Sequence, residues 1–183
     1  RTSPYRFYQF WINTEDENIE KLLKLFTFLD LEEIDEIVVR HFKDPGKRIA
    51  QKKLASEITR IVHGDEALKT ARRASEILFG GSFDPSELDS AMVDVLSGEV
   101  PSGSVDTGFP SNPVDLLVAS GCCKSKGEAR RLIKGGGIYL NGTRISDEAL
   151  PVEEKDILAG EHIFFRLGKK RFYMIQVEHE DSK

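Results

Sequence analysis

Residues 125–142, SKGEARRLIKGGGIYLNG, constrain the fold more than any other segment of the chain. Ser125 and Glu128 have the spacing of a capping box, in which two side chains satisfy backbone amides at a helix start. Three successive glycines stop that helix near Lys134, because glycine tolerates the left-handed backbone of a helix end. The apolar residues that follow lead into an Asn-Gly pair, a strong signal of a tight turn between strands. The segment therefore predicts a capped helix, a sharp stop, a short strand and a turn.

The charges of this helix lie on one side of it. Six basic residues and one acid occur between Lys124 and Arg144. At ~100° per residue, Ala129, Leu132 and Ile133 share one arc of the helix, and the basic residues fall on the neighbouring arc. Unpaired cations four residues apart slightly destabilise a helix, so a polyanion that neutralises them is one explanation of the stripe. A solvated helix face is the other explanation, because charge runs are usually only surface.

Length and composition indicate a folded, soluble chain. Its 183 residues suffice for one or two domains, and 39% of them are hydrophobic. No apolar run approaches the ~20 residues that span a bilayer, so we expect no membrane partner. The net charge is −5, but residues 1–110 carry 14 basic and 20 acidic side chains, whereas residues 111–183 carry 12 and 11. This distribution argues against a general nucleic-acid binder and favours a small, directed cluster of contacts.

The two cysteines indicate a reducing compartment. Cys122 and Cys123 are neighbours, and adjacent cysteines rarely form a disulfide, so we expect a cytoplasmic protein. Without a nearby histidine they are also a poor zinc site, and we expect no bound metal. The chain begins at Arg1 without a signal peptide, which indicates a piece of something longer.

Two domains of different class are predicted, which makes the fold α+β. Five capped segments with helical periodicity predict an all-helical domain over residues 1–96. These segments lie near residues 15–28, 31–41, 45–63, 65–78 and 85–96. Residues 97–112 hold three glycines, four serines and two prolines, a composition typical of a linker. Residues 113–183 then predict a small domain with a basic helix pair packed on a short antiparallel sheet.

Local signals place the elements of the second domain. An Asn-Pro pair caps a helix over residues 113–119, and the helix that starts at Ser125 follows it. Strand-like runs at residues 162–167 and 171–177 flank a Gly-Lys-Lys turn and predict a hairpin. In the first domain, the four aromatic residues between Phe7 and Trp11 are expected to pack a core rather than to stack on bases.

The 125–142 segment closely resembles a known RNA-binding domain. Its pattern S-x-G-E-A-R-R-L-I-x-x-G-x-I-x-L-N-G is the hallmark of the small domain named after ribosomal small-subunit protein four, and the resemblance covers Leu116–Ile145. That family grips structured RNA by shape and phosphates, through the basic helix and the turn after it, and needs no aromatic set for reading bases. The resemblance implies these RNA-binding residues: Lys124, Ser125, Lys126, Arg130, Arg131, Lys134, Asn141, Gly142 and Arg144.

A second resemblance lies at the amino-terminal end. The residues RTSPYRFYQFWIN, from Arg1 to Asn13, resemble the segment after the catalytic signature loop of bacterial-type tyrosyl-tRNA synthetases. In that family a helical anticodon-side domain, a linker and the same RNA-binding domain follow in this order. The resemblance therefore implies tRNA recognition and positioning by the C-terminal portion of such an enzyme, with tyrosine tRNA as partner. It also implies anticodon contacts near the helical domain, where Asp16 and Asn18 are candidates.

The resemblance stops short of a catalytic domain. The chain contains no HIGH-type or KMSKS-type motif and no glycine-rich phosphate cradle. We therefore expect no catalytic residue and no cofactor in this chain, and the resemblance assigns ATP use and tyrosine ligation to the parent enzyme. The four histidines are scattered and indicate structural or solvated roles. The chain alone is expected to be a monomer, and the parent a homodimer.

Two other functions remain open at this point. One is a free-standing RNA-binding module that acts on ribosomal RNA without a synthetase parent. The other is a helical protein-interaction domain with an incidental basic patch. The genomic reading frame before Arg1 distinguishes the first, and RNA titration at two salt concentrations distinguishes the second.

Overall fold

The computed structural model describes residues 2–80, 83–106 and 108–178, and the chain divides into two compact units. The first unit ends at Ser75 and the second begins at Glu76, within helix α5 (Asp65–Gly80). The division therefore lies ahead of residues 97–112. Helices alone build the first unit, whereas helices and a sheet build the second, so the predicted α+β class is confirmed. Within the described ranges, no helix is both long and apolar enough to cross a bilayer.

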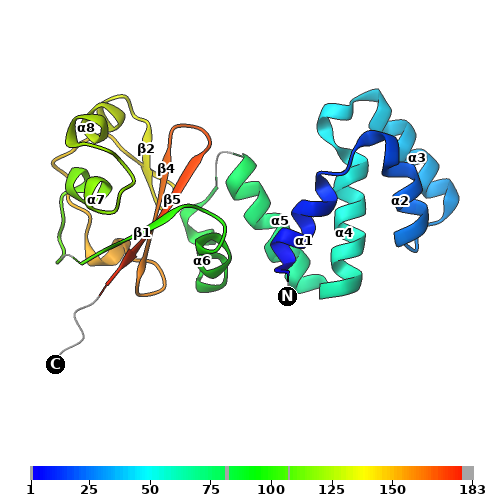
Figure 1. Ribbon diagram of the computed structural model, residues 1–183, viewed down its shortest axis with the longest axis horizontal. Coiled ribbons are helices and arrows are strands. Elements are labelled where there is room, and N and C mark those ends of the chain that lie inside the picture. The colour runs from blue at the N-terminus through cyan, green and yellow to red at the C-terminus, as the bar shows by residue number, and fades with distance from the viewer. Residues whose placement is uncertain (1, 81–82, 107, 179–183) are drawn as a thin grey trace. The chain divides into compact units, whose positions relative to one another are not determined.

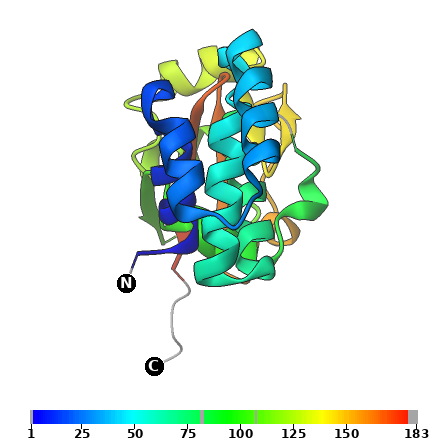
Figure 2. The same cartoon turned by 90° about the vertical axis from the view of Figure 1, so that its right-hand side faces the viewer.

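The first unit packs its helices around an aliphatic core (Figures 1 and 2). In chain order they are α1 (Pro4–Ile12), α2 (Ile19–Phe26), α3 (Leu31–Lys43), α4 (Ile49–His63) and the first part of α5, with 3-10 turns at Asp16–Asn18 and Pro45–Lys47. Helix α4 contacts α1, α2 and α3. Ile19, Leu23 and Leu54 are fully buried where α2 and α4 meet. The unit is thus a small bundle held by helix α4.

Helix α1 is absent from the five helices that periodicity predicts. Ser3 accepts the backbone amide of Arg6 at its start, and Pro4 occupies the first helical position, where its missing amide costs nothing. Tyr5 and Tyr8 are buried in this helix. The ring of Phe10, by contrast, is 69% exposed, so the aromatic run packs a core only in part.

Two helices begin later than their cap signals predict, α2 at residue 19 rather than 15 and α4 at residue 49 rather than 45. Before α2, the chain turns to bring the Asp16 carboxylate to the side chains of His41 and Gln51. Before α4, Arg48 has a left-handed φ of 52°, which interrupts the helix that the Asp-Pro pair would otherwise start. The first departure accompanies contacts between residues distant in sequence, which local signals do not contain.

The second unit is centred on a five-stranded sheet with the order β1-β5-β4-β2-β3. In chain order the strands are β1 (Ser102–Val105), β2 (Ile138–Leu140), β3 (Thr143–Ile145), β4 (His162–Leu167) and β5 (Arg171–Val177). The predicted β4–β5 hairpin is therefore confirmed with its boundaries. Strand β1 runs parallel to β5, and the other pairs are antiparallel, so the sheet is mixed rather than purely antiparallel. Part of the segment expected as a linker is thus a strand.

A close approach of two backbones explains why strand β1 forms from a serine- and glycine-rich segment. An added Cβ on Gly103 would lie 2.0 Å from the carbonyl oxygen of Ser120 and 2.7 Å from the hydroxyl of Tyr173. That hydroxyl donates a 2.7 Å hydrogen bond to the same carbonyl oxygen. Val105 at the end of the strand is only 4% exposed. Glycine at position 103 therefore lets the edge strand pass directly beneath the end of helix α7.

Helices cover both faces of the sheet (Figure 1). Helices α7 (Pro113–Ala119) and α8 (Lys126–Lys134) pack on one face, where Leu117, Ile133 and Phe165 share one buried core. Helix α6 (Ser90–Ser97) lies on the opposite side. There the ring centroids of Phe83 and Phe164 are 6.0 Å apart. The predicted helix pair is therefore confirmed, and both of its helices pack on the same face of the sheet.

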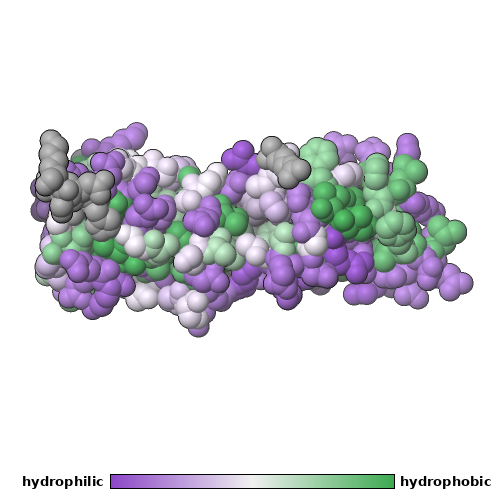
Figure 3. Space-filling view, turned by 90° about the horizontal axis from the view of Figure 1, so that it is seen from below, coloured by the Kyte–Doolittle hydropathy of each residue, from purple (hydrophilic) through white to green (hydrophobic). Residues whose placement is uncertain are grey.

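The first unit exposes many apolar side chains. The large ones in its helices α1, α2 and α4, and directly after α2, are Phe10, Leu25, Phe26, Phe28, Ile61 and Val62. The ring centroid of Trp11 lies 5.2 Å from that of Phe10 and 5.4 Å from that of Phe26, so three of the rings are continuous. Figure 3 shows hydrophobic residues gathered over this unit. Because monomeric proteins rarely expose such patches, this face is the part of the unit best suited to a protein contact.

Candidate nucleic-acid interface

Helix α8 begins with a cap that differs slightly from the predicted capping box. Ser125 Oγ accepts the amide of Glu128 at 3.2 Å, as predicted. The Glu128 carboxylate accepts the amide of Lys124 at 2.8 Å, whereas a capping box would engage the amide of Ser125. The cap therefore fixes the loop before the helix as well as its first turn. It also places a negative charge at the helix start, which makes that position less suited to a phosphate.

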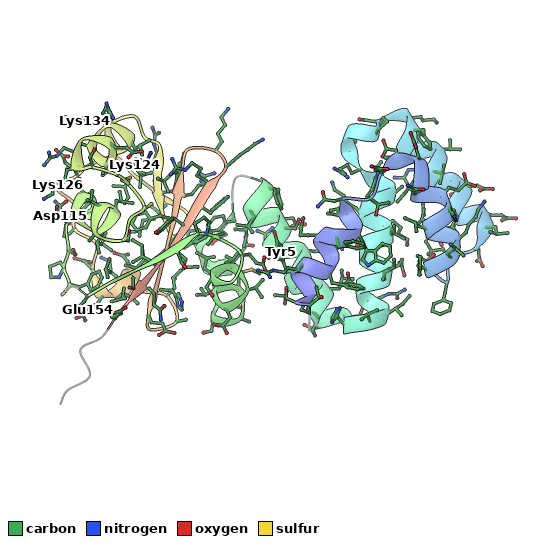
Figure 4. The ribbon with its side chains drawn as sticks, viewed as in Figure 1. Tyr5, Asp115, Lys124, Lys126, Lys134 and Glu154 are labelled. Atoms are coloured by element: carbon green, nitrogen blue, oxygen red, sulfur yellow. The ribbon has the colours of Figure 1, made fainter. Side chains whose placement is uncertain are left out.

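The basic side chains of α8 point away from the core. Ala129 and Ile133 are buried in the core of the second unit, and Leu132 is half-buried against it. The cations are all exposed: Lys124, Lys126, Arg130, Arg131 and Lys134. Figure 4 shows Lys126 and Lys134 at the outer edge of the second unit. The predicted division of the helix into an apolar and a basic side is therefore confirmed.

Ion pairs divide these cations into two groups. Lys126 Nζ lies 2.7 Å from Oδ1 of Asp115, and Arg130 Nε lies 3.2 Å from Oε2 of Glu148. Arg131 and Lys134 have no carboxylate within 4.0 Å among the residues that the structure describes. Of the cations within α8 itself, the unpaired ones therefore lie toward its C-terminal end, whereas Lys124, ahead of the helix, is a further exposed cation without an ion pair among the described residues.

The β4–β5 hairpin adds cations that the motif does not contain. The amide of Gly168, which lies in the hairpin turn, donates a 2.6 Å hydrogen bond to the carbonyl oxygen of Gly137, just after α8. Lys169, Lys170 and Arg171 follow Gly168 and are exposed. The hairpin turn thus joins the C-terminal end of α8. The sequence shows the basic run itself, but only the hydrogen bond reveals which helix end it joins.

Asn141 and Gly142 shape the turn between β2 and β3. Asn141 donates from Nδ2 to the carbonyl oxygen of Asp156 at 2.6 Å, and its Oδ1 accepts the amide of Phe164 at 2.9 Å. Gly142 has a φ of 91°, and an added Cβ would lie 3.0 Å from the ring of Phe83. Both polar groups of the Asn141 side chain are therefore engaged inside the protein, and Gly142 is required by the turn itself.

Arg144 lies against the end of α8. The backbone of Gly136 leaves room for its guanidinium, since an added Cβ there would overlap Nη2 of Arg144 at 1.4 Å. Gly136 also has a φ of 64°, a conformation that residues with side chains rarely adopt. The glycine stop after α8 therefore serves two purposes: it ends the helix, and it brings Arg144 close to the unpaired cations.

A polar pocket of about 740 Å³ lies in the first unit. Its lining residues are Asn13, Thr14, Glu15, Asp16, Glu17, Pro45, Gly46 and Arg48. Hydrogen bonds from Nε2 of the buried His41, at 2.9 Å, and from Gln51 lower the pKa of the Asp16 carboxyl. Arg48 has its buried Nε without a hydrogen-bond partner among the described residues. The pocket therefore offers an ionised acceptor beside the Arg48 cation, whereas Asn18 does not line it.

The cysteines lack the character of a reactive site. Cys122 and Cys123 are free thiols, and both are buried. Burial raises the pKa of the Cys122 thiol to about 12, so it is neutral and a weak nucleophile near pH 7. In the described part of the chain, no three histidine, cysteine or acidic side chains are grouped as metal ligands. The two cysteines therefore occupy a buried bend between α7 and α8.

Two family matches together span most of the chain. Residues 92–175 match the family described as Tyrosine--tRNA ligase SYY-like C-terminal domain. Residues 1–80 match the family described as tRNA synthetases class I (W and Y). The two matches follow the division into a helical unit and a sheet-containing unit.

Curated relatives agree with these matches. The tyrosine--tRNA ligase of Anaeromyxobacter dehalogenans is 42% identical over 179 residues, which are 97% of this chain and 42% of that protein. The tyrosine--tRNA ligase of Geobacillus stearothermophilus is 44% identical over 176 residues, which are 96% of this chain and 41% of that protein. The chain thus spans less than half the length of these relatives.

A solved structure resembles part of the chain. The solution structure of a tyrosyl-tRNA synthetase C-terminal domain is 36% identical, covers 53% of this chain and 97% of its own, and gives a TM-score of 0.44. The family assignment rests on the sequence comparisons alone.

Proposed function

The chain belongs to the tyrosine–tRNA ligase family and corresponds to the C-terminal part of its members, and we propose that it binds tyrosine tRNA and positions it for ligation. The observation that carries this proposal is the continuity of exposed cations from α8 to the β4–β5 hairpin. The hydrogen bond between Gly168 and Gly137 joins the two elements. The proposed phosphate-binding surface consists of Arg131 and Lys134 from α8, and Lys169 and Lys170 from the β4–β5 hairpin.

This surface suits recognition of RNA by shape. Its members are long, exposed cations, which meet phosphates and carry no base preference of their own. The helix and the hairpin are fixed by a common sheet, so the spacing of their cations is set before RNA arrives. A structured RNA whose phosphates match that spacing binds without paying to order the site. The domain thereby contributes binding energy and orientation to a reaction performed elsewhere.

The pocket beside Asp16 is proposed as a second tRNA contact, for an unpaired base of the anticodon. The ionised, partly exposed carboxylate of Asp16 accepts hydrogen bonds from base amino or imino groups, and the positive charge of Arg48 lines the same pocket. Single-stranded bases are the parts of an RNA that enter such pockets. A tRNA with a substituted anticodon base should therefore bind more weakly to the wild-type chain, and Asp16→Asn should remove that difference.

The proposal leaves catalysis to residues outside this sequence. The 183 residues contain neither class-typical ATP-binding motif, and the described pocket is lined by acids rather than by a phosphate cradle. We also propose that the isolated chain is a monomer. The exposed rings of Phe10 and Phe28 are the surface most able to contradict this, and sedimentation at several concentrations tests it.

A fluorescence titration tests the proposed function against its alternatives. Tyrosine tRNA should bind the chain more tightly than a ribosomal RNA fragment of similar length, and added salt should weaken both. Preference for the ribosomal fragment would instead support a ribosome-directed module. Absence of salt-dependent RNA binding would support a protein-interaction domain.

A further inference from the structure

Two carboxylates from outside helix α8 hold cations of that helix. Asp115 belongs to α7 and lies 2.7 Å from Lys126. Figure 4 labels the two residues next to each other at the outer edge of the second unit. Glu148 follows strand β3 and lies 3.2 Å from Arg130. Neither pair arises from the i, i+4 spacing of one helix, which often brings surface charges together by chance of sequence. The tertiary fold itself brings both carboxylates to the helix.

Glu148 directs one carboxylate oxygen at Arg130. That atom, Oε2, is buried and accepts no hydrogen bond from the described residues, although the Glu148 side chain as a whole is 38% exposed. Salt therefore screens this pair as it screens other surface ion pairs. The pair partly neutralises Arg130 before RNA arrives, while the Arg130 side chain stays 54% exposed.

The pairs give the basic surface a direction. Lys126 and Arg130 occupy the N-terminal and middle turns of α8, and both face a carboxylate. Lys134 occupies the last turn, next to the hairpin that Gly168 joins to Gly137. Within α8 itself, the cations that face no carboxylate among the described residues thus lie toward its C-terminal end, and Lys124 precedes the helix. A phosphate that approaches the other end must displace a carboxylate or lie beside it.

We propose that Asp115 and Glu148 are specificity-determining residues that keep RNA phosphates away from the N-terminal part of α8. This inference rests on the proposed function. A tRNA that docks on the C-terminal end of α8 and on the hairpin does not need Lys126 or Arg130. An RNA of another shape samples many orientations, including those over Lys126 and Arg130, and the two carboxylates weaken those complexes. They therefore reduce non-cognate binding more than cognate binding.

The strength of surface ion pairs sets the expected size of the effect. An exposed pair typically changes binding roughly two- to fivefold, so removing two carboxylates should change it about tenfold. Each cation set free can also meet a phosphate and release a counterion. The slope of log affinity against log salt for non-cognate RNA should therefore steepen by roughly 1 to 2 units.

The double variant Asp115→Asn/Glu148→Gln tests this inference. Its affinity for tyrosine tRNA and for a non-cognate tRNA is titrated between about 50 and 200 mM salt, the range over which phosphate contacts respond strongly. Non-cognate affinity should rise about tenfold at the low-salt end, and cognate affinity by less than threefold. Glu154→Gln is the matched control, because Glu154 is exposed and lies away from α8 (Figure 4). It should leave the ratio of the two affinities unchanged.

Three results would overturn the inference. Weaker binding of both RNAs would mean that the carboxylates position Lys126 and Arg130 for phosphate contact. An equal gain for both RNAs would mean that only total charge matters, and no change would mean that the pairs are inert. A wild-type chain that binds neither RNA would instead refute the proposed function, so the two failures are distinguishable.

Discussion

The amide of Gly168 donates a 2.6 Å hydrogen bond to the carbonyl oxygen of Gly137, and this bond joins the β4–β5 hairpin to the end of helix α8. Two basic segments more than 30 residues apart in sequence thereby become neighbours. The first is helix α8, and the second is the hairpin turn with Lys169 and Lys170. The proposed phosphate-binding surface depends on this contact, and each segment can be tested on its own.

Neutralising the hairpin tests its share of that surface. Lys169→Gln/Lys170→Gln should weaken binding of tyrosine tRNA and shrink the slope of log affinity against log salt by roughly 1.5 to 2 units, because two phosphate contacts are lost. Both side chains are exposed, so the fold should be unaffected. Titration at several salt concentrations measures the slope. Lys155→Gln, a change outside both segments, should leave it unchanged, and an equal effect of this control would refute a local contact.

Strand β1 should depend on the missing side chain at Gly103. Gly103→Ala would push a methyl group to within 2.0 Å of the Ser120 carbonyl oxygen, so the sheet edge must move. Such overpacking typically costs about 1–3 kcal/mol. Hydrogen exchange should show reduced protection of amides in β1 and β5, while amides of the first unit keep theirs. Gly108→Ala is the control, since an added Cβ there meets nothing within 4 Å. Equal protection of the β1 and β5 amides in both variants would mean that strand β1 does not depend on the missing side chain at position 103.

The Asp16 contacts should appear in the pH dependence of stability. Hydrogen bonds from His41 and Gln51 lower the pKa of Asp16 below its usual 3.8 in the folded protein. The ionised carboxylate therefore stabilises the fold above that pH, and the stabilisation is lost as the pH falls through the lowered pKa. Thermal melting between about pH 6 and pH 2.5 should show this loss, and Asp16→Asn should flatten it. Glu17→Gln should retain the wild-type profile; a flattened profile in this control would assign the effect to total charge.

The chain alone should form no tyrosyl-adenylate. Its sequence contains no HIGH-type or KMSKS-type motif, and activation of an amino acid needs a site for the phosphates of ATP. Exchange of labelled pyrophosphate into ATP, with tyrosine present, measures this step. Pure protein should give the rate of a blank reaction. Tyrosine-dependent exchange above the blank would show that residues 1–80 retain part of the activation site.

Local sequence signals predicted an element correctly where the residues that cap it and bury its apolar side lie within it or next to it. The Asn112 cap of α7 accepts the amide of Val114, and Ser125 caps α8, as their sequence patterns predict. The apolar side of α8 was equally readable, since Ala129 and Ile133 are buried. Strand β1 was not, because a segment rich in serine and glycine gains its pairing only from β5. Helix α1 was missed although its signals are local, because Ser3 caps it and its buried Tyr5 and Tyr8 have helical spacing.

The same limit applies to the candidate site, because the sequence reveals its cations but not the contacts that they make. The motif contains the cations of α8, but the carboxylates that hold two of them come from α7 and from the segment after β3. The hairpin cations are adjacent to one another in sequence, yet nothing local relates them to Lys134. Asn141 is the opposite case. The family resemblance implies that it binds RNA, but both polar groups of its side chain are bonded inside the protein. Long-range contacts decide which charged residues are available.

The most direct test of the account is the salt dependence of tyrosine tRNA binding by Arg131→Gln/Lys134→Gln. These cations are exposed and unpaired among the described residues, and they lie opposite the buried Ala129 and Ile133, so circular dichroism should report an intact fold. Affinity should fall, and the slope of log affinity against log salt should shrink by roughly 1.5 to 2 units. A folded variant with unchanged affinity and unchanged slope would show that the basic side of α8 is only a solvated surface, and it would contradict the account.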